Sequence, residues 1–386
     1  MRQKAPRMPN LLVTCPQHNA PCLRQEVEHL GYRVVEEFVT GVRIVGTMED
    51  AMRLNLWLRT GYRVLYHLAD ARARDGRELY REALRVTWEE WIPADGYLTV
   101  TSSVDTPSVR DSRFPNMKLK DAIVDRIASR CGERPDSGPE SHGSVVFLRW
   151  KGTSCSFWLD TSGEPLTRRG YRAIPWKAPM HEALAATLIR TTRWTPGSAL
   201  VNPMCGGGTL AIEGALIASG RAPGLTRSGF AFMHLRGFRK EIWNDMVEEA
   251  RAAQRSTIDA PIIASDHASQ AIDAARQNAR AAGVEKLIEF VCCDFTETPI
   301  PPPPGIVILN PEYGERLGVR HALEAVYAGI GDFFKRTCAG YTGYVFTGAP
   351  DLAKRIGLRT RRRIPFFNST IECRLLEFEM YEGSRQ

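Results

Sequence analysis

The segment ALVNPMCGGGTLAIEGALIA, Ala199 to Ala218, decides the fold of the catalytic half of this chain. Its first three residues are apolar and predict a strand, and Cys205 to Gly208 predict a tight turn. From Thr209 onward, apolar residues recur at helical spacing. A strand, a glycine turn and a helix N-terminus form the nucleotide-binding corner of a doubly wound sheet, where missing Cβ atoms let a ligand lie against the backbone. The segment lacks the Gly-Lys-Ser/Thr of a P-loop and the third glycine of a pyrophosphate binder.

The segment NPEYGERLG, Asn310 to Gly318, follows the apolar run 306–309, which predicts a buried strand. Asn-Pro-x-Tyr at a strand end suits methylation of an exocyclic amine on a flipped base. The Asn310 side-chain oxygen and the Pro311 carbonyl can accept the two amino hydrogens, and Tyr313 offers a stacking face. Alone, the four residues would favour a proline-bounded turn. Together with the glycine turn, they indicate S-adenosylmethionine as the cofactor.

Two acidic residues follow the next predicted strands along the chain. Asp266 ends the run 261–265, where a carboxylate can accept both ribose hydroxyls. Asp294 follows the run 288–291 and could accept from the adenine amino group, with Phe295 against the ring. Each acid alone is more typical of a helix N-cap or a surface loop. Their order at successive strand ends favours the ligand interpretation.

These motifs, with MKLKDAIVD (117–125), WLDTSGEPLTRRGYR (158–172) and KAPMHEALAATLI (177–189), resemble the bacterial 23S rRNA guanine-N2 methyltransferases that carry an RNA-binding THUMP domain. The resemblance spans about residues 11–381 and matches the stand-alone form, although some members are fused to a second methyltransferase. It implies a catalytic group of Asn310, Pro311, Glu312 and Tyr313. It also implies a cofactor site of Asn202, Pro203, Cys205, Gly206, Gly208, Thr209, Asp266, Asp294 and Phe295.

Two positions depart from the family pattern. Asn202 stands where the family usually has an acid, which removes a negative charge near the cationic sulfonium. Glu312 stands where a second proline is usual, which adds a carboxylate beside the target amine. That carboxylate could pair with the N1–H and N2–H donors of guanine, or it could bind the sulfonium in the ground state without raising the rate. Loss of activity is therefore an open alternative.

Composition is consistent with an RNA-binding protein. The 386 residues are enough for two or three domains, and the net charge of +7 permits a nucleic-acid partner. Nine cysteines occur without a C-x-x-C pair, so we expect reduced thiols, no metal site and a cytoplasmic protein. No apolar stretch approaches the length of a membrane span. Cys205 could be a nucleophile, but a small packed residue is the favoured interpretation.

The fold class that we predict is α/β, with a Rossmann-like class I methyltransferase domain preceded by an α+β ferredoxin-like and THUMP region. Residues 1–61 form the ferredoxin-like subdomain, with a capping box at Thr47 and Asp50. Residues 62–162 form the THUMP domain, including a helix over 117–130. Residues 163–179 are a linker, and 180–386 form a mostly parallel sheet closed by an antiparallel hairpin, 359–365 with 371–381.

The predicted RNA contacts are the basic residues of two family motifs: Lys118, Lys120, Arg168, Arg169 and Arg172. We predict an S-adenosylmethionine-dependent methyltransferase acting on guanine N2 in 23S rRNA, through positioning alone. Three alternatives stay open: a tRNA guanine-N2 methyltransferase, a catalytically silent RNA-binding or assembly factor, and a protein-glutamine methyltransferase. The predicted RNA-binding front half argues against the last of these.

Overall fold

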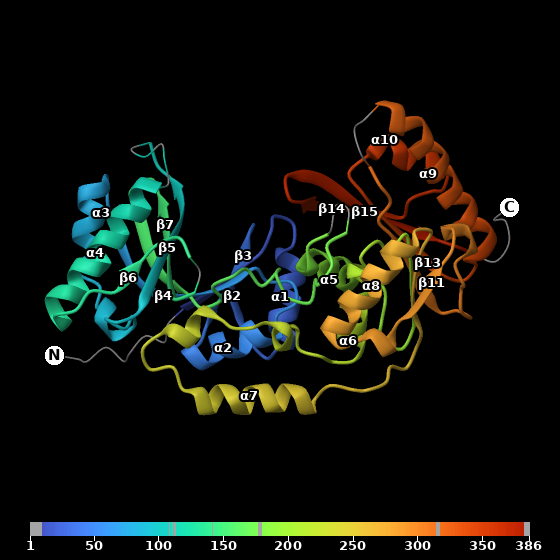
Figure 1. Cartoon of the computed structure of the whole chain (residues 1–386). Helices are drawn as coiled ribbons and strands as arrows, with labels where there is room; N and C mark the ends of the chain where they lie inside the picture. The colour runs from blue at the N-terminus through green and yellow to red at the C-terminus, as the bar shows by residue number, and fades with distance from the viewer. Residues whose placement is uncertain are drawn as a thin grey trace. The chain divides into compact units, whose positions relative to one another are not determined.

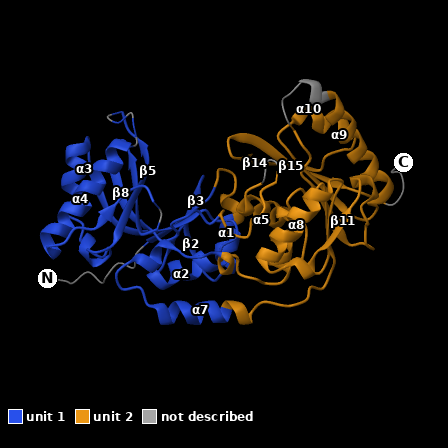
Figure 2. Cartoon of the chain, viewed as in Figure 1, with its two compact units in different colours: residues 1–15, 23–166, 227–249 blue, residues 16–22, 167–226, 250–386 orange. Residues whose placement is uncertain are grey.

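The computed structural model describes residues 10–107, 109, 111, 113–140, 142–176, 180–313 and 317–381, without the side chains of 317–320. The chain forms two compact units (Figures 1 and 2). Unit 1 contains residues 1–15, 23–166 and 227–249, and unit 2 contains 16–22, 167–226 and 250–386. Each unit is built around one mixed sheet.

Unit 1 contains an eight-stranded sheet in the order β2-β3-β1-β4-β8-β7-β5-β6. Its strands are β1 (Asn10–Thr14), β2 (Val34–Phe38), β3 (Gly41–Val45), β4 (Arg63–Arg72), β5 (Tyr97–Asp105), β6 (Asp136–Ser137), β7 (Ser144–Lys151) and β8 (Ser154–Asp160). Its helices are α2 (Met48–Trp57), α3 (Gly76–Ala83), α4 (Arg113–Cys131) and most of both α1 (Ala20–His29) and α7 (Lys240–Ala252). The predicted capping box at Thr47 and Asp50 is confirmed, because each side chain accepts the other's backbone N–H.

Unit 2 contains a seven-stranded sheet in the order β11-β10-β9-β12-β13-β15-β14. Its strands are β9 (Ala199–Pro203), β10 (Ile262–Asp266), β11 (Glu289–Cys292), β12 (Gly305–Leu309), β13 (Thr342–Thr347), β14 (Arg362–Asn368) and β15 (Ile371–Glu379). The helices are α5 (Glu182–Thr191), α6 (Thr209–Ala218), α8 (Ser269–Ala282), α9 (Leu317–Thr337) and α10 (Pro350–Ala353). The first five strands pair in parallel, and β15 runs antiparallel to β13 and β14. This confirms the predicted methyltransferase fold with its closing hairpin.

The central strands of unit 2 are buried on both faces. In β12, Ile306 and Ile308 belong to one core cluster, while Val307 and Leu309 belong to the other. Such strands need continuous apolar sequence, which is why they were recognisable. The chain proceeds outward from β9 through β10 to β11 and then returns to β12 on the other side of β9. The carboxyl ends of β9 and β12 therefore lie at the switch point where doubly wound sheets bind ligands.

The residue ranges of the two units differ from the domain boundaries that we expected. Residues 227–249 cluster with unit 1, although we expected everything beyond residue 180 in the catalytic domain. In this segment Phe230 and Phe232 stack, and Trp243 packs edge-on against both. The backbone N–H of Phe232 also donates to the Thr161 carbonyl. These contacts join distant parts of the sequence, so periodicity cannot reveal them. Of the predicted linker, residues 177–179 lie outside the described part.

Candidate active site

The glycine turn between β9 and α6 has the backbone that its sequence requires. Gly206 and Gly208 have φ of 54° and 81°, in the left-handed region that glycine adopts at little cost. Gly208 is the N-cap of α6, so Thr209 begins the helix. Met204 also has a positive φ, 54°, which is unfavourable for a side chain of this size. Pro203, just before it, is buried. The turn thus brings backbone N–H groups to the carboxyl edge of the sheet.

A substitution of Gly208 by Ala should destabilise the protein by about 1–3 kcal/mol. The left-handed backbone disfavours any Cβ at this position, and one placed there would lie 2.9 Å from Ala275 Cβ. Thermal unfolding should therefore begin at a lower temperature. Gly197 is a matched control, because nothing lies within 4 Å of its Cβ position. Equal stability of the two alanine variants would contradict this account of the turn.

Asp266 lies beside this turn at the end of β10 and is largely buried, with 9% of its surface exposed. Its Oδ2 accepts from Gly206 N at 3.0 Å, and its Oδ1 accepts from Ala268 N at 3.0 Å. These two bonds fix the orientation of the carboxylate. A carboxylate has about four lone-pair sites, so both oxygens can still accept ribose hydroxyls.

Asp294 and Phe295 follow β11, as the sequence suggested. Asp294 is exposed, and its Oδ1 accepts from the backbone N–H and the hydroxyl of Thr296, at 2.9 and 2.6 Å. It therefore caps a short 3-10 turn, which is the ordinary role of such an acid. Phe295 packs edge-on against Phe333, with ring centroids 6.0 Å apart.

The ends of β9 and β12 are joined by Asn202. Its Nδ2 donates to the Ile308 carbonyl at 2.9 Å, and the side chain is 1% exposed. Within the described residues, its Oδ1 and that of Asn310 are buried without a hydrogen-bond partner. A buried acceptor left unpaired is costly, so such atoms call for an explanation. Two neighbouring strand ends thus each carry an amide oxygen available to a donor.

The residues after Asn310 are held in different ways. Pro311 is buried and Glu312 is exposed. The Tyr313 hydroxyl accepts from Asn368 Nδ2 at 2.8 Å, and its ring lies against Gly348, 3.1 Å from that residue's Cβ position. Burial raises the pKa of Tyr313 to about 12, so the phenol stays neutral. Tyr313 is therefore a fixed, uncharged ring.

Cys205 lies in the turn with a half-buried side chain. Burial raises the pKa of its thiol above the ordinary value, and the charge of Asp266 adds to the effect. A neutral thiol is a poor nucleophile. This agrees with the interpretation of Cys205 as a packed residue.

Two residues of this region were not predicted. Asn278 on α8 accepts from Ile174 N at 2.9 Å, and its Nδ2 donates to the carbonyls of Ile174 and Gly207, both at 3.1 Å. The side chain of Trp176 lies 3.3 Å from the Cβ positions of Gly206 and Gly207. The segment before residue 177 is thus fixed against the glycine turn. Nothing in the local sequence indicates these contacts, because they join three separate segments.

The prediction of Arg169 as an RNA contact is wrong. This residue is 1% exposed, and its Nε donates to Glu213 Oε1 at 2.8 Å. The Tyr171 hydroxyl donates to the same oxygen at 2.9 Å. A buried guanidinium needs such a partner, so Arg169 joins the linker to α6 instead of facing solvent.

The other four RNA contacts stay predictions. Arg172 donates to the Met180 carbonyl at 2.6 Å and lies 3.5 Å from Glu182, while Arg168 is exposed. Lys118 and Lys120 are half-buried on α4 of unit 1. Lys118 lies over the Phe114 ring, and Lys120 pairs with Asp121 at 3.2 Å. These two lysines and the arginines belong to different units.

Two negative results concern the described residues only. Among them, no group of three or more metal-ligating side chains is placed to hold an ion. No helix within the described ranges is both long and apolar enough to cross a membrane.

Three family models match consecutive parts of the chain. Residues 10–65 match an RlmL ferredoxin-like domain, residues 73–138 a THUMP domain, and residues 169–377 an RMKL-like methyltransferase domain. The ribosomal RNA large subunit methyltransferase K/L of Syntrophotalea carbinolica is 38% identical over 96% of this chain. The chain spans 53% of that relative's length.

Two further proteins match nearly end to end. A Synechocystis protein, whose name describes it as a candidate RNA methyltransferase, is 35% identical over 92% of this chain and 93% of its own length. The crystal structure of SMU.472, which contains SAH, superposes with a TM-score of 0.88 at 25% identity, covering 97% of this chain and 99% of that one. The chain therefore belongs to the RMKL-like methyltransferase family.

Proposed function

We propose that this protein methylates the exocyclic N2 of a guanine in 23S rRNA. The observation that carries the proposal is the buried Oδ1 of Asn310 at the switch point of the sheet, which has no hydrogen-bond partner among the described residues. An amide oxygen there lacks a donor, and an exocyclic amine supplies one. The ribosomal RNA methyltransferase name of the Syntrophotalea relative supports RNA as the substrate. Such a substrate implies a cytoplasmic enzyme.

The hydrogen-bond acceptors around the turn fit S-adenosylmethionine. Asp266 is oriented to accept from ribose hydroxyls. The Oδ1 of Asn202, to which no described residue donates, can accept from the ammonium group of the methionine part. Gly206 and Gly208 supply the left-handed backbone of the turn, and Pro203, Cys205 and Thr209 lie in or beside it. Asp294 and Phe295 would border the adenine. We assign these residues to the cofactor as a proposal.

The cofactor supplies a methyl group on a cationic sulfur, and this chain must present a nitrogen lone pair to it. The guanine N2 lone pair is delocalised into the ring. Asn310 Oδ1 and the Pro311 carbonyl would accept hydrogen bonds from the two N–H groups and favour a tetrahedral nitrogen, which frees the lone pair. The nitrogen would take the methyl group as the sulfur–carbon bond breaks, the neutral thioether would leave, and the methylated nitrogen would lose one proton to solvent. Tyr313, held by Asn368, would stack on the flipped base. Catalysis then rests on positioning, without a covalent enzyme intermediate.

The test is nucleoside mass spectrometry of rRNA and tRNA from a strain that lacks this gene. We expect the N2-methylguanosine content of purified 23S rRNA to fall and to return when the wild-type gene is restored. Loss from tRNA alone would replace the rRNA substrate by tRNA. An unchanged profile in both RNAs would overturn the proposed reaction.

Glu312 provides a separate prediction, because it is exposed and free of a rigid proline backbone. If its carboxylate accepts from guanine N1–H and, in place of the Pro311 carbonyl, from one N2–H, Glu312→Gln should lower single-turnover transfer about tenfold, since an amide presents only one acceptor oxygen. Glu312→Pro, which restores the family pattern, should be no better than wild type. An inactive wild type rescued by proline would instead favour a catalytically silent assembly factor.

A further inference from the structure

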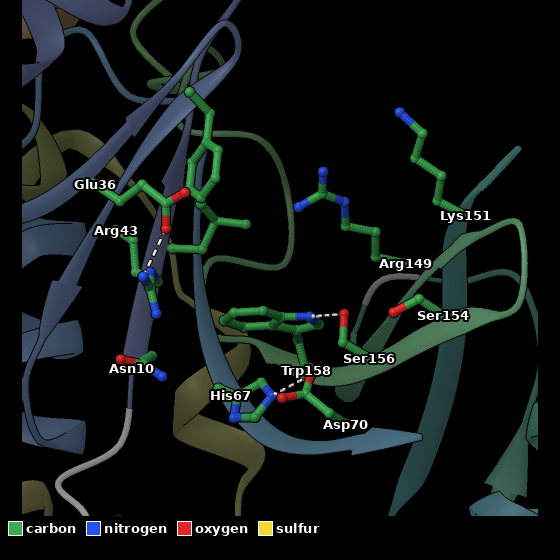
Figure 3. A pocket seen from close by; sticks show the side chains of 12 residues that line it. Asn10, Glu36, Arg43, His67, Asp70, Arg149, Lys151, Ser154, Ser156 and Trp158 are labelled. Atoms are coloured by element: carbon green, nitrogen blue, oxygen red, sulfur yellow. Dashed lines mark hydrogen bonds and ion pairs between the residues drawn. The ribbon is translucent and has the colours of Figure 1, made fainter. Parts of the chain in front are cut away.

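One face of the unit 1 sheet is hollowed into a groove of about 420 Å³, far from the glycine turn in sequence (Figure 3). Strand alternation determines which side chains line it. Along β7, Leu148 and Trp150 are fully buried on one face, whereas Arg149 and Lys151 are exposed on the other. Register places Arg149 opposite Ser156 on β8, so both strands contribute polar groups to the same face. The volume lies in the range of pockets that hold small ligands.

The groove has an excess of positive charge. Its lining has three basic side chains, Arg43, Arg149 and Lys151, and two acidic ones, Glu36 and Asp70. Glu36 pairs with Arg43 at 2.6 Å, and Asp70 lies 3.0 Å from His67 Nε2. Within the described ranges, neither Arg149 nor Lys151 forms an ion pair, although the exposed Asp105 lies opposite Lys151 in register. Two cations are therefore available to an anionic ligand. Phosphate is one such group.

Aromatic rings accompany these cations. The Arg149 guanidinium lies 6.0 Å from the Phe38 ring centroid, a cation–π contact at the side of the groove. Trp158 lies in its floor with His67 edge-on at 4.7 Å, and its indole N–H donates to Ser156 at 2.8 Å. Flat rings beside cations suit a planar base attached to a phosphate.

We propose that this groove binds one or two unpaired nucleotides of the RNA substrate. A base would stack on Phe38 and the Arg149 guanidinium, and the adjoining phosphate would pair with Arg149 and Lys151. The RNA must be unpaired there, because a duplex hides its base faces in the helical stack. This inference rests on the proposed function for its choice of RNA. An acidic peptide matches the cations but leaves the aromatic rings unused.

Binding of a fluorescein-labelled ten-nucleotide oligouridine to the full chain tests the proposal. Removing both cations, in Arg149→Gln/Lys151→Gln, should weaken binding about tenfold at low salt. The slope of log affinity against log salt should fall by about 0.7, because the two cations together neutralise one phosphate of a single strand. Arg77→Gln/Arg130→Gln is the matched control. It removes the same charge from exposed positions on α3 and α4 and should change affinity less than twofold.

The Phe38→Leu variant tests the proposed stacking of a base on the Phe38 ring. Phe38→Leu keeps an apolar side chain but removes the ring face, so oligouridine affinity should fall about fivefold or more with an unchanged salt slope. Melting temperatures of all variants must match wild type within a few degrees. Equal affinity of the Arg149→Gln/Lys151→Gln variant and its control for oligouridine would contradict the proposal that this groove binds RNA. The proposal would also fail if wild type bound a ten-base-pair RNA duplex as tightly as oligouridine, or if a deca-aspartate peptide displaced oligouridine.

Methyl transfer to rRNA separates failure of the groove from failure of the proposed function. The Arg149→Gln/Lys151→Gln variant should raise KM for rRNA and leave kcat unchanged. The lost contacts bind the RNA equally well in the ground state and in the transition state, so their loss weakens binding without slowing the chemical step. If wild type methylates rRNA but groove variants bind oligouridine normally, the groove proposal fails and the function stands. If the groove variants weaken oligouridine binding but no RNA is methylated, the groove stands and the function fails.

Discussion

Replacing Asn310 by Ala should lower single-turnover methyl transfer about 100- to 1,000-fold, the usual effect of removing one preorganised hydrogen-bonding group from a transition state. The variant loses the buried Oδ1 that has no partner among the described residues. Without that acceptor, the target amine stays planar and its lone pair stays delocalised. Transfer of a labelled methyl group to unmodified rRNA under single-turnover conditions measures the effect.

Cofactor affinity distinguishes a chemical role of Asn310 from a structural one. Calorimetry of the Asn310→Ala variant should give an S-adenosylmethionine Kd within about twofold of wild type, because the proposed contact is with the base. Asn310→Asp keeps an acceptor and should retain more activity than Asn310→Ala. A parallel loss of cofactor affinity and of transfer would show that Asn310 only maintains the fold of the site.

The fold was predictable where one segment carries its own signal. The β12 strand was expected at 306–309 and is found at Gly305–Leu309, because burial on both faces demands a continuous apolar run. The capping box at Thr47 also depends on residues three apart. In contrast, β4 was not predicted, because a bulge between His67 and Ala69 breaks its alternation. The α4 helix begins at Arg113, earlier than expected, since Pro115 is tolerated in a first turn.

The candidate site was predictable as far as it follows strand ends. Asp266 and Asn310 were chosen because parallel strands bring their carboxyl ends to one edge, and both lie there. Arg169 was misjudged because its partner Glu213 is 44 residues away and shows no local signal. The groove was missed for a similar reason. Phe38, Arg149 and their neighbours come from strands whose spatial order differs from their sequence order.

A change of Asp266 to Asn should weaken S-adenosylmethionine binding by about 2–4 kcal/mol, which is roughly 30- to 1,000-fold in Kd. The amide keeps one oxygen, which can still accept from Gly206 N and preserve the turn. It loses the charge and the second acceptor that the two ribose hydroxyls require. Calorimetric titration of the cofactor into the purified variant measures the loss.

Asp273→Asn is the matched control for this variant, because it removes one negative charge from an exposed position on α8 of the same unit. Its cofactor affinity should equal that of wild type, and both variants should melt within a few degrees of it. The comparison isolates hydrogen bonding at Asp266 from the change in net charge. If Asp266→Asn binds the cofactor as tightly as Asp273→Asn does, the carboxylate only fixes Gly206 and Ala268, and the ribose must be held elsewhere.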